Sequence, residues 1–118
     1  MEITYTGSPD QLIAELQSDH IEINTVQDAL DLMANCRYNG SEKIIVNSKN
    51  LHPTFFDLKS GMAGEILQKF SNYRCQLAIV GDFENIESKS LRDFIRESNR
   101  MGRIFFVGDR EEGVERLK

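Results

Sequence analysis

Residues 55–65 carry the side chains with the most potential for chemistry in this chain. The segment reads Phe-Phe-Asp-Leu-Lys-Ser-Gly-Met-Ala-Gly-Glu and follows a short apolar run. Ser60 and Gly61 stand where a helix is expected to begin, so the Ser60 hydroxyl should lie near unpaired backbone N–H groups. Such a place suits an anion or a phosphorylated serine. The plainer interpretation is that Ser60 caps the helix, while Gly61 and Gly64 allow it to pack closely on a sheet.

Three carboxylates in and near this segment offer a second chemistry. Asp57 and Glu65 lie within it, and Asp82 ends a later apolar run, where open sheets place ligands. Brought together, they could act as the general acid and base of a small hydrolase or transferase. A further alternative is an anion- or nucleotide-sensing domain that binds at the helix starts after Asp57 and Asp82. The structural alternatives are a turn acid at Asp82 and an ion pair between Glu65 and Lys69.

Basic residues recur at spacings of three and four near the end of the chain. They are Lys89, Arg92, Arg96, Arg100 and Arg103. This spacing places them on one face of a helix, with Asp93 and Glu97 beside them. A solvated helix face is the plain interpretation. The alternative is a docking surface for an acidic partner or for the chain's own acidic first half, with Arg92, Arg96 and Arg100 as the candidate contacts.

Signatures of metal binding and of nucleophilic catalysis are missing from the sequence. Neither His20 nor His52 has a second His or Cys within four residues, so the spacing of a structural zinc site is not met. No G-x-S-x-G, Walker or G-x-G-x-x-G motif occurs. Cys36 and Cys75 have no C-x-x-C partner, and without a visible secretion signal they indicate reduced thiols in a cytoplasm. We therefore expect neither a metal nor a cofactor.

Composition limits the class of protein and of partner. The chain has 118 residues, of which 40% are hydrophobic and 28% charged, which is typical of one globular domain spanning residues 1–118. Lys and Arg number 14 and Asp and Glu 19, so the net charge is −5. An acidic chain argues against binding to nucleic acid or to an anionic membrane. No apolar run approaches the roughly 18 residues of a membrane span. Composition says little about activity, so the enzyme and the anion sensor stay open beside a cytoplasmic protein that binds another protein.

Apolar patterns predict the strands that must position these residues. Alternation over residues 2–6 and 11–17, around the turn Gly7-Ser8-Pro9-Asp10, favours an opening hairpin, although 11–17 also fits a helix. Ile21 and Ile23 continue the alternation. Continuous apolar runs at 43–47, 76–82 and 104–107 predict strands that are covered on both faces.

Helical periodicity predicts about four helices between and after these strands. We expect them from Thr25 to Asn39, from Gly61 to about Tyr73, from Ser88 or Ser90 to Met101, and after Asp109. This order predicts an α/β fold with a mixed, largely parallel sheet of about five strands. The expected core consists of Leu30, Met33, Ile45, Ile66, Leu67, Leu77, Ile79, Val80, Phe94, Ile95, Phe105 and Val107.

Several stretches of the sequence resemble a bacterial family of small single-domain proteins known only as a domain of unknown function. They read DALDL from Asp28, FFDL from Phe55, G-x-AGEILQKF from Gly61, AIVGDF from Ala78 and SKSLRDFI from Ser88. The resemblance spans about residues 11–117 and implies no activity.

A more distant resemblance is to STAS domains, the sulfate transporter and anti-sigma factor antagonist fold, whose element order is the same. In that family a serine in an Asp-Ser-Ser-Gly-like turn before a helix is phosphorylated by a partner kinase. Asp57, Ser60 and Gly61 match that turn, whereas Leu58 and Lys59 do not. The resemblance implies a STAS-like fold and a non-catalytic regulatory module that binds another protein, with Ser60 as its switch and a homodimer as one option.

Overall fold

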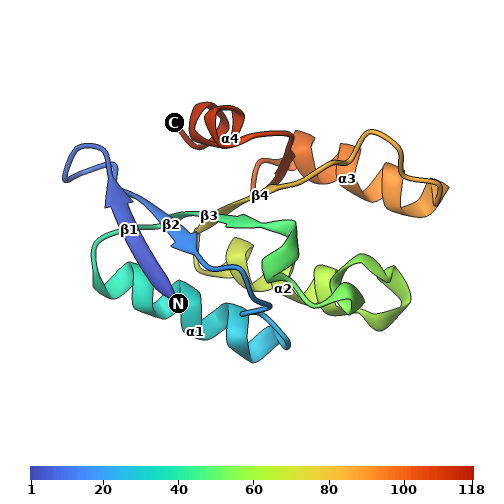
Figure 1. Cartoon of the computed structure of the whole chain (residues 1–118), viewed down its shortest axis with the longest axis horizontal. Helices are drawn as coiled ribbons and strands as arrows, with labels where there is room; N and C mark the ends of the chain where they lie inside the picture. Colours follow the sequence, from blue (N-terminus) through green and yellow to red (C-terminus); the bar gives the residue numbers. More distant parts are fainter.

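A five-stranded sheet forms the centre of the fold, in a computed structural model that describes residues 1–118 (Figure 1). Its strands are β1 (Glu2–Thr6), β2 (Ile13–Gln17), β3 (Lys43–Asn47), β4 (Gln76–Val80) and β5 (Ile104–Val107), and they lie side by side in chain order. β1 and β2 pair antiparallel, and all other neighbours pair parallel. The predicted opening hairpin and the mixed, largely parallel α/β sheet are confirmed.

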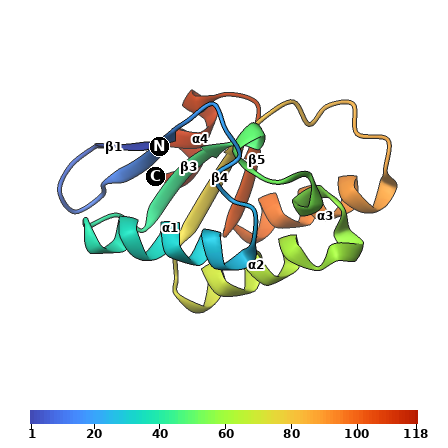
Figure 2. The same ribbon diagram turned by 60° about the horizontal axis from the view of Figure 1, so that its bottom comes forward.

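Helices cover the two faces of the sheet unequally (Figure 2). They are α1 (Val26–Tyr38), α2 (Met62–Asn72), α3 (Lys89–Met101) and α4 (Arg110–Leu117). The first three pack with the main apolar cluster on one face, and α4 closes a smaller cluster on the other. Three short 3₁₀ turns join β3 to α2, namely η1 (Ser48–Asn50), η2 (Pro53–Phe56) and η3 (Leu58–Ser60). None of the helices combines the length and the apolar character needed to cross a bilayer.

Side chains at the helix starts explain where three of the helices begin. The Thr25 hydroxyl accepts the Asp28 N–H at 3.1 Å, and the Asp28 carboxylate accepts the Thr25 N–H in return, which completes the predicted capping box. Ser88, rather than Ser90, caps α3 by accepting the Leu91 N–H at 3.2 Å. The predicted cap of α4 at Asp109 is confirmed as well.

Most residues expected in the core are buried, but four are only half-buried: Leu30, Leu67, Val80 and Phe94. Leu30 and Leu67 pack against the main cluster from the flanks of their helices. Val80 is the last residue of β4 and packs at the margin of the smaller cluster. Phe94 lies in the first half of α3, which extends past the sheet (Figure 1). For these four residues the predicted full burial is wrong.

We expect Ile79→Ala to lower the free energy of unfolding by about 2–5 kcal/mol. Ile79 lies in β4, one residue before its end, and is completely buried, so the truncation leaves a cavity in the main cluster. Urea unfolding measures the loss, with Met101→Ala at the exposed end of α3 as the control. A loss near zero for Ile79→Ala would contradict the interior position of β4 between β3 and β5.

The buried side chain of Asn50 joins the turn after β3 to the connection between β2 and α1. Its amide nitrogen donates to the carbonyl oxygens of Ser18 at 3.0 Å and His20 at 2.8 Å. Its amide oxygen accepts the Asn47 N–H at 3.0 Å. Asn50 is completely buried, so these bonds replace contacts with water and fix the path of both segments.

Backbone hydrogen bonds between residues 22–23 and residues 50–52 extend this junction. The Asn50 carbonyl accepts the N–H groups of Glu22 and Ile23, both at 2.9 Å, and Ile23 forms an isolated parallel bridge with Leu51. The His52 N–H then donates to the Ile23 carbonyl at 2.9 Å. The predicted alternation through Ile23 therefore ends in a single bridge rather than in a longer β2.

We expect Asn50→Ala to lower the free energy of unfolding by about 2–4 kcal/mol, because two carbonyls and one N–H lose their buried partner. Asn50→Asp has nearly the same shape but directs carboxylate oxygens at two carbonyls. Burial raises the pKa of such an acid, so its destabilisation should grow as the pH rises above about 4.

Urea unfolding of both Asn50 variants between pH 4 and 8 makes this comparison, with Asn85→Ala on an exposed loop as the control. Equal stability of Asn50→Ala and the parent would show that the junction does not hold the two segments.

Side chains from α3 occupy the free edge of β5. The Asn99 amide accepts the Phe106 N–H at 2.7 Å and donates to the Phe106 carbonyl at 3.3 Å. The Ser98 hydroxyl donates to the Ile104 carbonyl at 2.6 Å. These contacts pair the Ile104 carbonyl and both backbone polar groups of Phe106, and they hold α3 against the sheet.

Candidate functional site

The carboxyl ends of β3, β4 and β5 bring the segments with candidate site residues to one edge of the sheet. The 3₁₀ turns follow β3, and residues 81–88 follow β4. The two segments approach closely, because a Cβ atom on Gly81 would lie 2.7 Å from the Ser48 hydroxyl oxygen. The rings of Phe56 and Phe83 lie 6.2 Å apart. This edge is therefore the place where the predicted features can act together.

Ser60 lies in η3, just before α2, and its hydroxyl is used twice. It donates to the Thr54 carbonyl at 2.7 Å and accepts the Met62 N–H at 3.2 Å. Gly61 adopts a left-handed conformation with φ of 80°, and the helix begins at Met62. Gly61 therefore precedes the first turn of α2 instead of lying in it. Ser60 itself is exposed, so a modifying enzyme could reach it.

The carboxylates of Asp57, Glu65 and Asp82 are all exposed, and their contacts are local. Asp57 accepts the Lys59 N–H at 3.2 Å, and Asp82 accepts the Glu84 N–H at 3.2 Å. The cleft that contains Asp82 includes neither Asp57 nor Glu65. The structure thus gives these three groups separate local roles and no shared acid–base geometry.

Gly64 has a different surrounding from the one expected. It is exposed on α2, and no atom outside its own helix lies within 4 Å of a Cβ atom placed on it. The expectation that Gly64 permits a close approach to the sheet is therefore wrong. Gly61 instead is needed for its positive φ.

Aromatic side chains gather at this edge, a feature that the sequence patterns did not single out. Phe55 and Phe106 are buried, and their rings lie 6.2 Å apart. Phe56, Phe83 and Phe94 pack against them and stay partly exposed, with ring distances of 5.0 Å from Phe56 to Phe55, 5.2 Å from Phe83 to Phe106 and 6.2 Å from Phe94 to Phe106. The aromatic edge denotes Phe56, Phe83 and Phe94 from here on.

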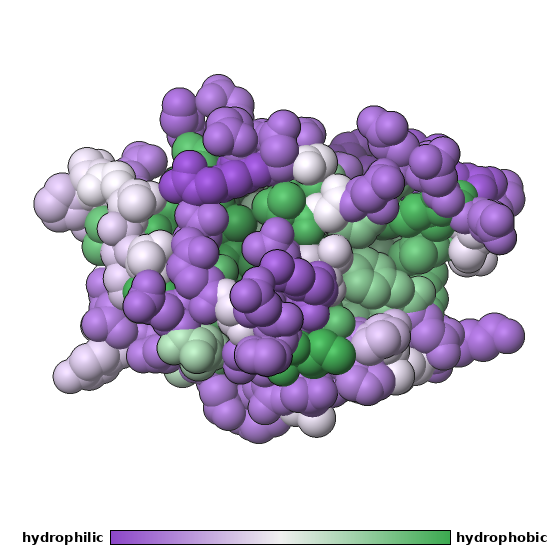
Figure 3. All heavy atoms as spheres, in the orientation of Figure 1, coloured by the Kyte–Doolittle hydropathy of each residue, from purple (hydrophilic) through white to green (hydrophobic).

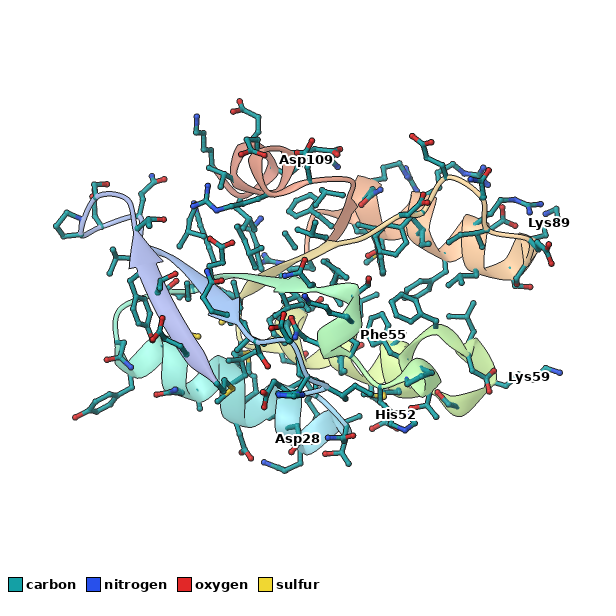
Figure 4. The ribbon with its side chains drawn as sticks, viewed as in Figure 1. Asp28, His52, Phe55, Lys59, Lys89 and Asp109 are labelled. Carbon is teal, nitrogen blue, oxygen red and sulfur yellow. The ribbon has the colours of Figure 1, made fainter.

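The aromatic edge opens between two helix starts. Figure 3 shows an apolar hollow on this end of the molecule, between α3 and the segment that leads into α2. Figure 4 places Lys59 and Lys89 at the same end, before α2 and at the start of α3, while Phe55 lies further inside. The available signal in the sequence was three large apolar residues outside the predicted strands, namely Phe55, Phe56 and Phe83.

A cleft of about 560 Å³ adjoins the aromatic edge at the ends of β4 and β5. Its apolar lining consists of Phe83, Ile95, Phe106 and Val107. Its polar lining includes Asp82, Glu84, Asn99 and Glu112, and no Lys, Arg or His lines it. The volume lies within the range of about 300–1,000 Å³ that is usual for ligand sites. Asp82 is the one predicted site residue that the cleft contains.

The basic face of α3 is partly neutralised, because two acids of the same helix, Asp93 and Glu97, lie among its four basic residues. Asp93 pairs with Lys89 at 2.9 Å and with Arg96 at 2.6 Å, and these contacts lower the pKa of its carboxyl. Arg100 pairs with Glu97. Arg92 donates to the carbonyls of Ile86 at 2.7 Å and Glu87 at 2.9 Å, and so fixes the loop before the helix. Arg92, Arg96 and Arg100 are exposed as expected, but each has a partner within the chain.

The remaining reactive groups are two thiols in the core and His52 at the start of η2. Cys36 and Cys75 are completely buried free thiols, and burial raises the pKa of Cys36 to about 11, opposite to the shift a nucleophile needs. The His52 ring accepts the Thr54 N–H at 3.2 Å, which caps η2. No group of three or more His, Cys, Asp or Glu side chains is placed to hold a metal ion.

We expect Gly64→Ala to raise the free energy of unfolding by about 0.5–1 kcal/mol, since alanine favours the helix and the added methyl group meets open space. Gly61→Ala should instead lower it by about 1–2 kcal/mol, because the left-handed backbone is strained for a residue with a Cβ atom. Urea unfolding of the Gly64→Ala and Gly61→Ala variants measures both changes. Stabilisation by both would contradict the left-handed conformation before α2.

Comparison with known proteins identifies a family but no activity. A family described as a domain of unknown function (DUF4180) matches residues 9–117, which confirms the first resemblance seen in the sequence. A candidate anti-sigma factor antagonist from Thermotoga maritima is 17% identical, with a TM-score of 0.48 over 98% of this chain and 93% of that one. The Bacillus cell fate determinant SpoIIAA in its phosphorylated form is 14% identical, with a TM-score of 0.40 over 99% of this chain and 100% of that one. No curated protein matches the chain.

Proposed function

The chain belongs to this family of unknown function, DUF4180, and we propose that it is a non-catalytic regulatory module that binds another protein through the aromatic edge. One observation carries the proposal: Phe56, Phe83 and Phe94 stay partly exposed together at the carboxyl end of a rigid parallel sheet. Partly exposed aromatic groups of this kind are enriched at the centres of protein interfaces.

Contacts behind the aromatic edge favour binding because they hold it in place. Phe56 and Phe83 pack on the buried rings of Phe55 and Phe106. The Asn50 junction fixes the backbone from which the segment with Phe56 departs. A surface whose side chains are already ordered loses little conformational entropy when a partner binds. The aromatic edge is thus prepared for association before a partner arrives.

Ser60 supplies the regulation in this proposal. A kinase that transfers the terminal phosphoryl group of ATP to the Ser60 hydroxyl oxygen releases the hydroxyl proton, so the bond to the Thr54 carbonyl at 2.7 Å is lost. The new charge is favoured by the start of α2 and by Lys59, and is opposed by Asp57. Thr54 and Phe56 belong to the same short turn, η2. Phosphorylation of Ser60, which breaks its bond to Thr54, would therefore shift Phe56 and with it the aromatic edge.

The alternatives formed from the sequence have weaker support. Asp57, Glu65 and Asp82 share no acid–base geometry, so an enzyme that uses them has no assembled centre. An anion or nucleotide sensor at Asp82 would face a cleft lined by carboxylates and by no cation.

The two buried free thiols, Cys36 and Cys75, favour a reducing compartment and thus the cytoplasm as the place of action.

Capture from a lysate of the native host, followed by mass spectrometry, tests the proposal. We expect Phe56→Ala to reduce the captured partner at least tenfold, because it removes a ring from the interface. Tyr38→Ala is the matched control: Tyr38 is an aromatic residue with 91% exposure at the last residue of α1, and its loss should change nothing.

Ser60 variants test the regulatory part of the proposal in the same assay. Ser60→Asp keeps an acceptor for the Met62 N–H but adds charge, and it should change the captured amount of partner. Ser60→Ala should lower the free energy of unfolding by about 1–2 kcal/mol through the loss of two hydrogen bonds. Partner capture by Phe56→Ala at the level of the parent would refute the interface, and unchanged capture by Ser60→Asp would refute the switch.

A further inference from the structure

We infer that the 560 Å³ cleft beside Phe83 receives a Lys or Arg side chain from a basic, apolar segment of the partner protein. The inference rests on the proposed function, because it assigns a chemistry to the partner that the aromatic edge binds. It differs from the sequence expectation of an acidic partner at the face of α3, where Asp93 and Glu97 already pair with Lys89, Arg96 and Arg100.

The charge of the cleft points to a cation. Asp82, Glu84 and Glu112 line it, and none of the three takes part in an ion pair within the chain. Asp82 uses one oxygen to accept the Glu84 N–H, and Glu112 uses one to accept the Gly108 N–H at 2.9 Å. Each of these carboxylates has a second oxygen available to accept a bond from a cation.

Cations near the cleft are already engaged elsewhere. Arg110, at the start of α4, pairs with Glu15 at 2.6 Å across the sheet. Arg116 donates to the Asn99 carbonyl at 2.7 Å and stacks over the ring of Phe105 at 4.8 Å. Residues 81–88 contain three acids and no Lys or Arg. The cleft therefore keeps its negative charge, and a partner must supply the positive one.

The apolar lining decides which kind of cation fits. Phe83, Ile95, Phe106 and Val107 form a surface that a small hydrated ion would leave unused. Lys and Arg side chains combine an aliphatic stem with a charged end, so the stem can contact the apolar lining while the end reaches the carboxylates. Phe83 belongs to both the cleft and the aromatic edge. One continuous segment with alternating basic and apolar residues can therefore occupy both.

Synthetic peptides test this assignment directly. The probes are a twelve-residue repeat of Leu-Lys-Phe-Lys, the matched repeat of Leu-Glu-Phe-Glu and the matched repeat of Ser-Lys-Ser-Lys, with n-butylamine as a small cation. Amide chemical shifts of the full chain report where each probe binds, and a titration gives its affinity. We expect the Leu-Lys-Phe-Lys peptide to bind at least tenfold more tightly than the other probes, to shift residues 81–84 and 106–112, and to weaken as salt rises.

Variants of the cleft acids complete the test. The double change Asp82→Asn with Glu84→Gln should weaken binding of the Leu-Lys-Phe-Lys peptide about three- to tenfold. Glu87→Gln is the control, because Glu87 lies in the same loop, is exposed and does not line the cleft. Loss of structure in the double variant would show in the amide spectrum, and Glu112→Gln then provides a second variant that can still accept the Gly108 N–H.

Each contrary outcome overturns a defined part of the inference. If the Leu-Glu-Phe-Glu peptide binds as tightly as the Leu-Lys-Phe-Lys peptide or more tightly, the preference for a cation is overturned. If the Ser-Lys-Ser-Lys peptide binds as tightly, the contribution of the apolar lining is overturned. Equal binding of n-butylamine overturns a protein segment as the occupant. If Phe56→Ala lowers partner capture while the double variant does not, the interface stands and the cleft assignment fails. If neither lowers capture, both fail.

Discussion

The completely buried amide of Asn50 is the contact on which the arrangement of the carboxyl edge depends. It satisfies two carbonyls from the connection before α1 and one N–H from the end of β3. Together with the backbone bonds of Ile23 to Asn50 and His52, it fixes the direction in which the segment of 3₁₀ turns leaves β3. This support matters because turns of three or four residues contribute few hydrogen bonds of their own. The position of Phe56, the backbone near Ser60 and the wall against Phe83 all follow from this junction. A polar side chain within an apolar core thus fixes the surface proposed to bind a partner.

Two principles account for the shape of that surface. Parallel strands end at one edge, so segments that are distant in sequence meet there. The first half of α3 extends past the sheet, so the inner face of that helix is covered incompletely (Figure 1). The aromatic rings fill part of the gap and remain partly in contact with water. The carboxylates that line the neighbouring cleft add a negative charge beside these rings, and this charge is the basis on which a basic partner segment is proposed.

Apolar patterns and turn residues were enough to predict the order of the elements from the sequence, because helices, half-buried strands and fully covered strands each leave a distinct apolar pattern. Even the ambiguous 11–17 segment was resolved correctly by the short turn before it. Polar contacts across long distances in sequence carry no such pattern. For this reason the sequence did not predict the bonds of Asn50 to the carbonyls of Ser18 and His20. Nor did it predict the bonds of Asn99 to the backbone of β5. The prediction for Gly64 was wrong for a related reason, because the sequence alone does not show whether another segment packs against a glycine.

The amide of Asn99 has a consequence for how the molecule behaves at high concentration. Four consecutive apolar residues, Ile104 to Val107, form the last strand at an edge of the sheet. A strand of that composition with free polar groups is a template for adding strands from other molecules and so for aggregation. The side chains of Asn99 and Ser98 form hydrogen bonds with the Phe106 N–H and with the carbonyls of Ile104 and Phe106. These backbone groups would otherwise be available to an added strand. The fold can therefore keep a strongly apolar terminal strand at its margin while closing that margin to polymerisation.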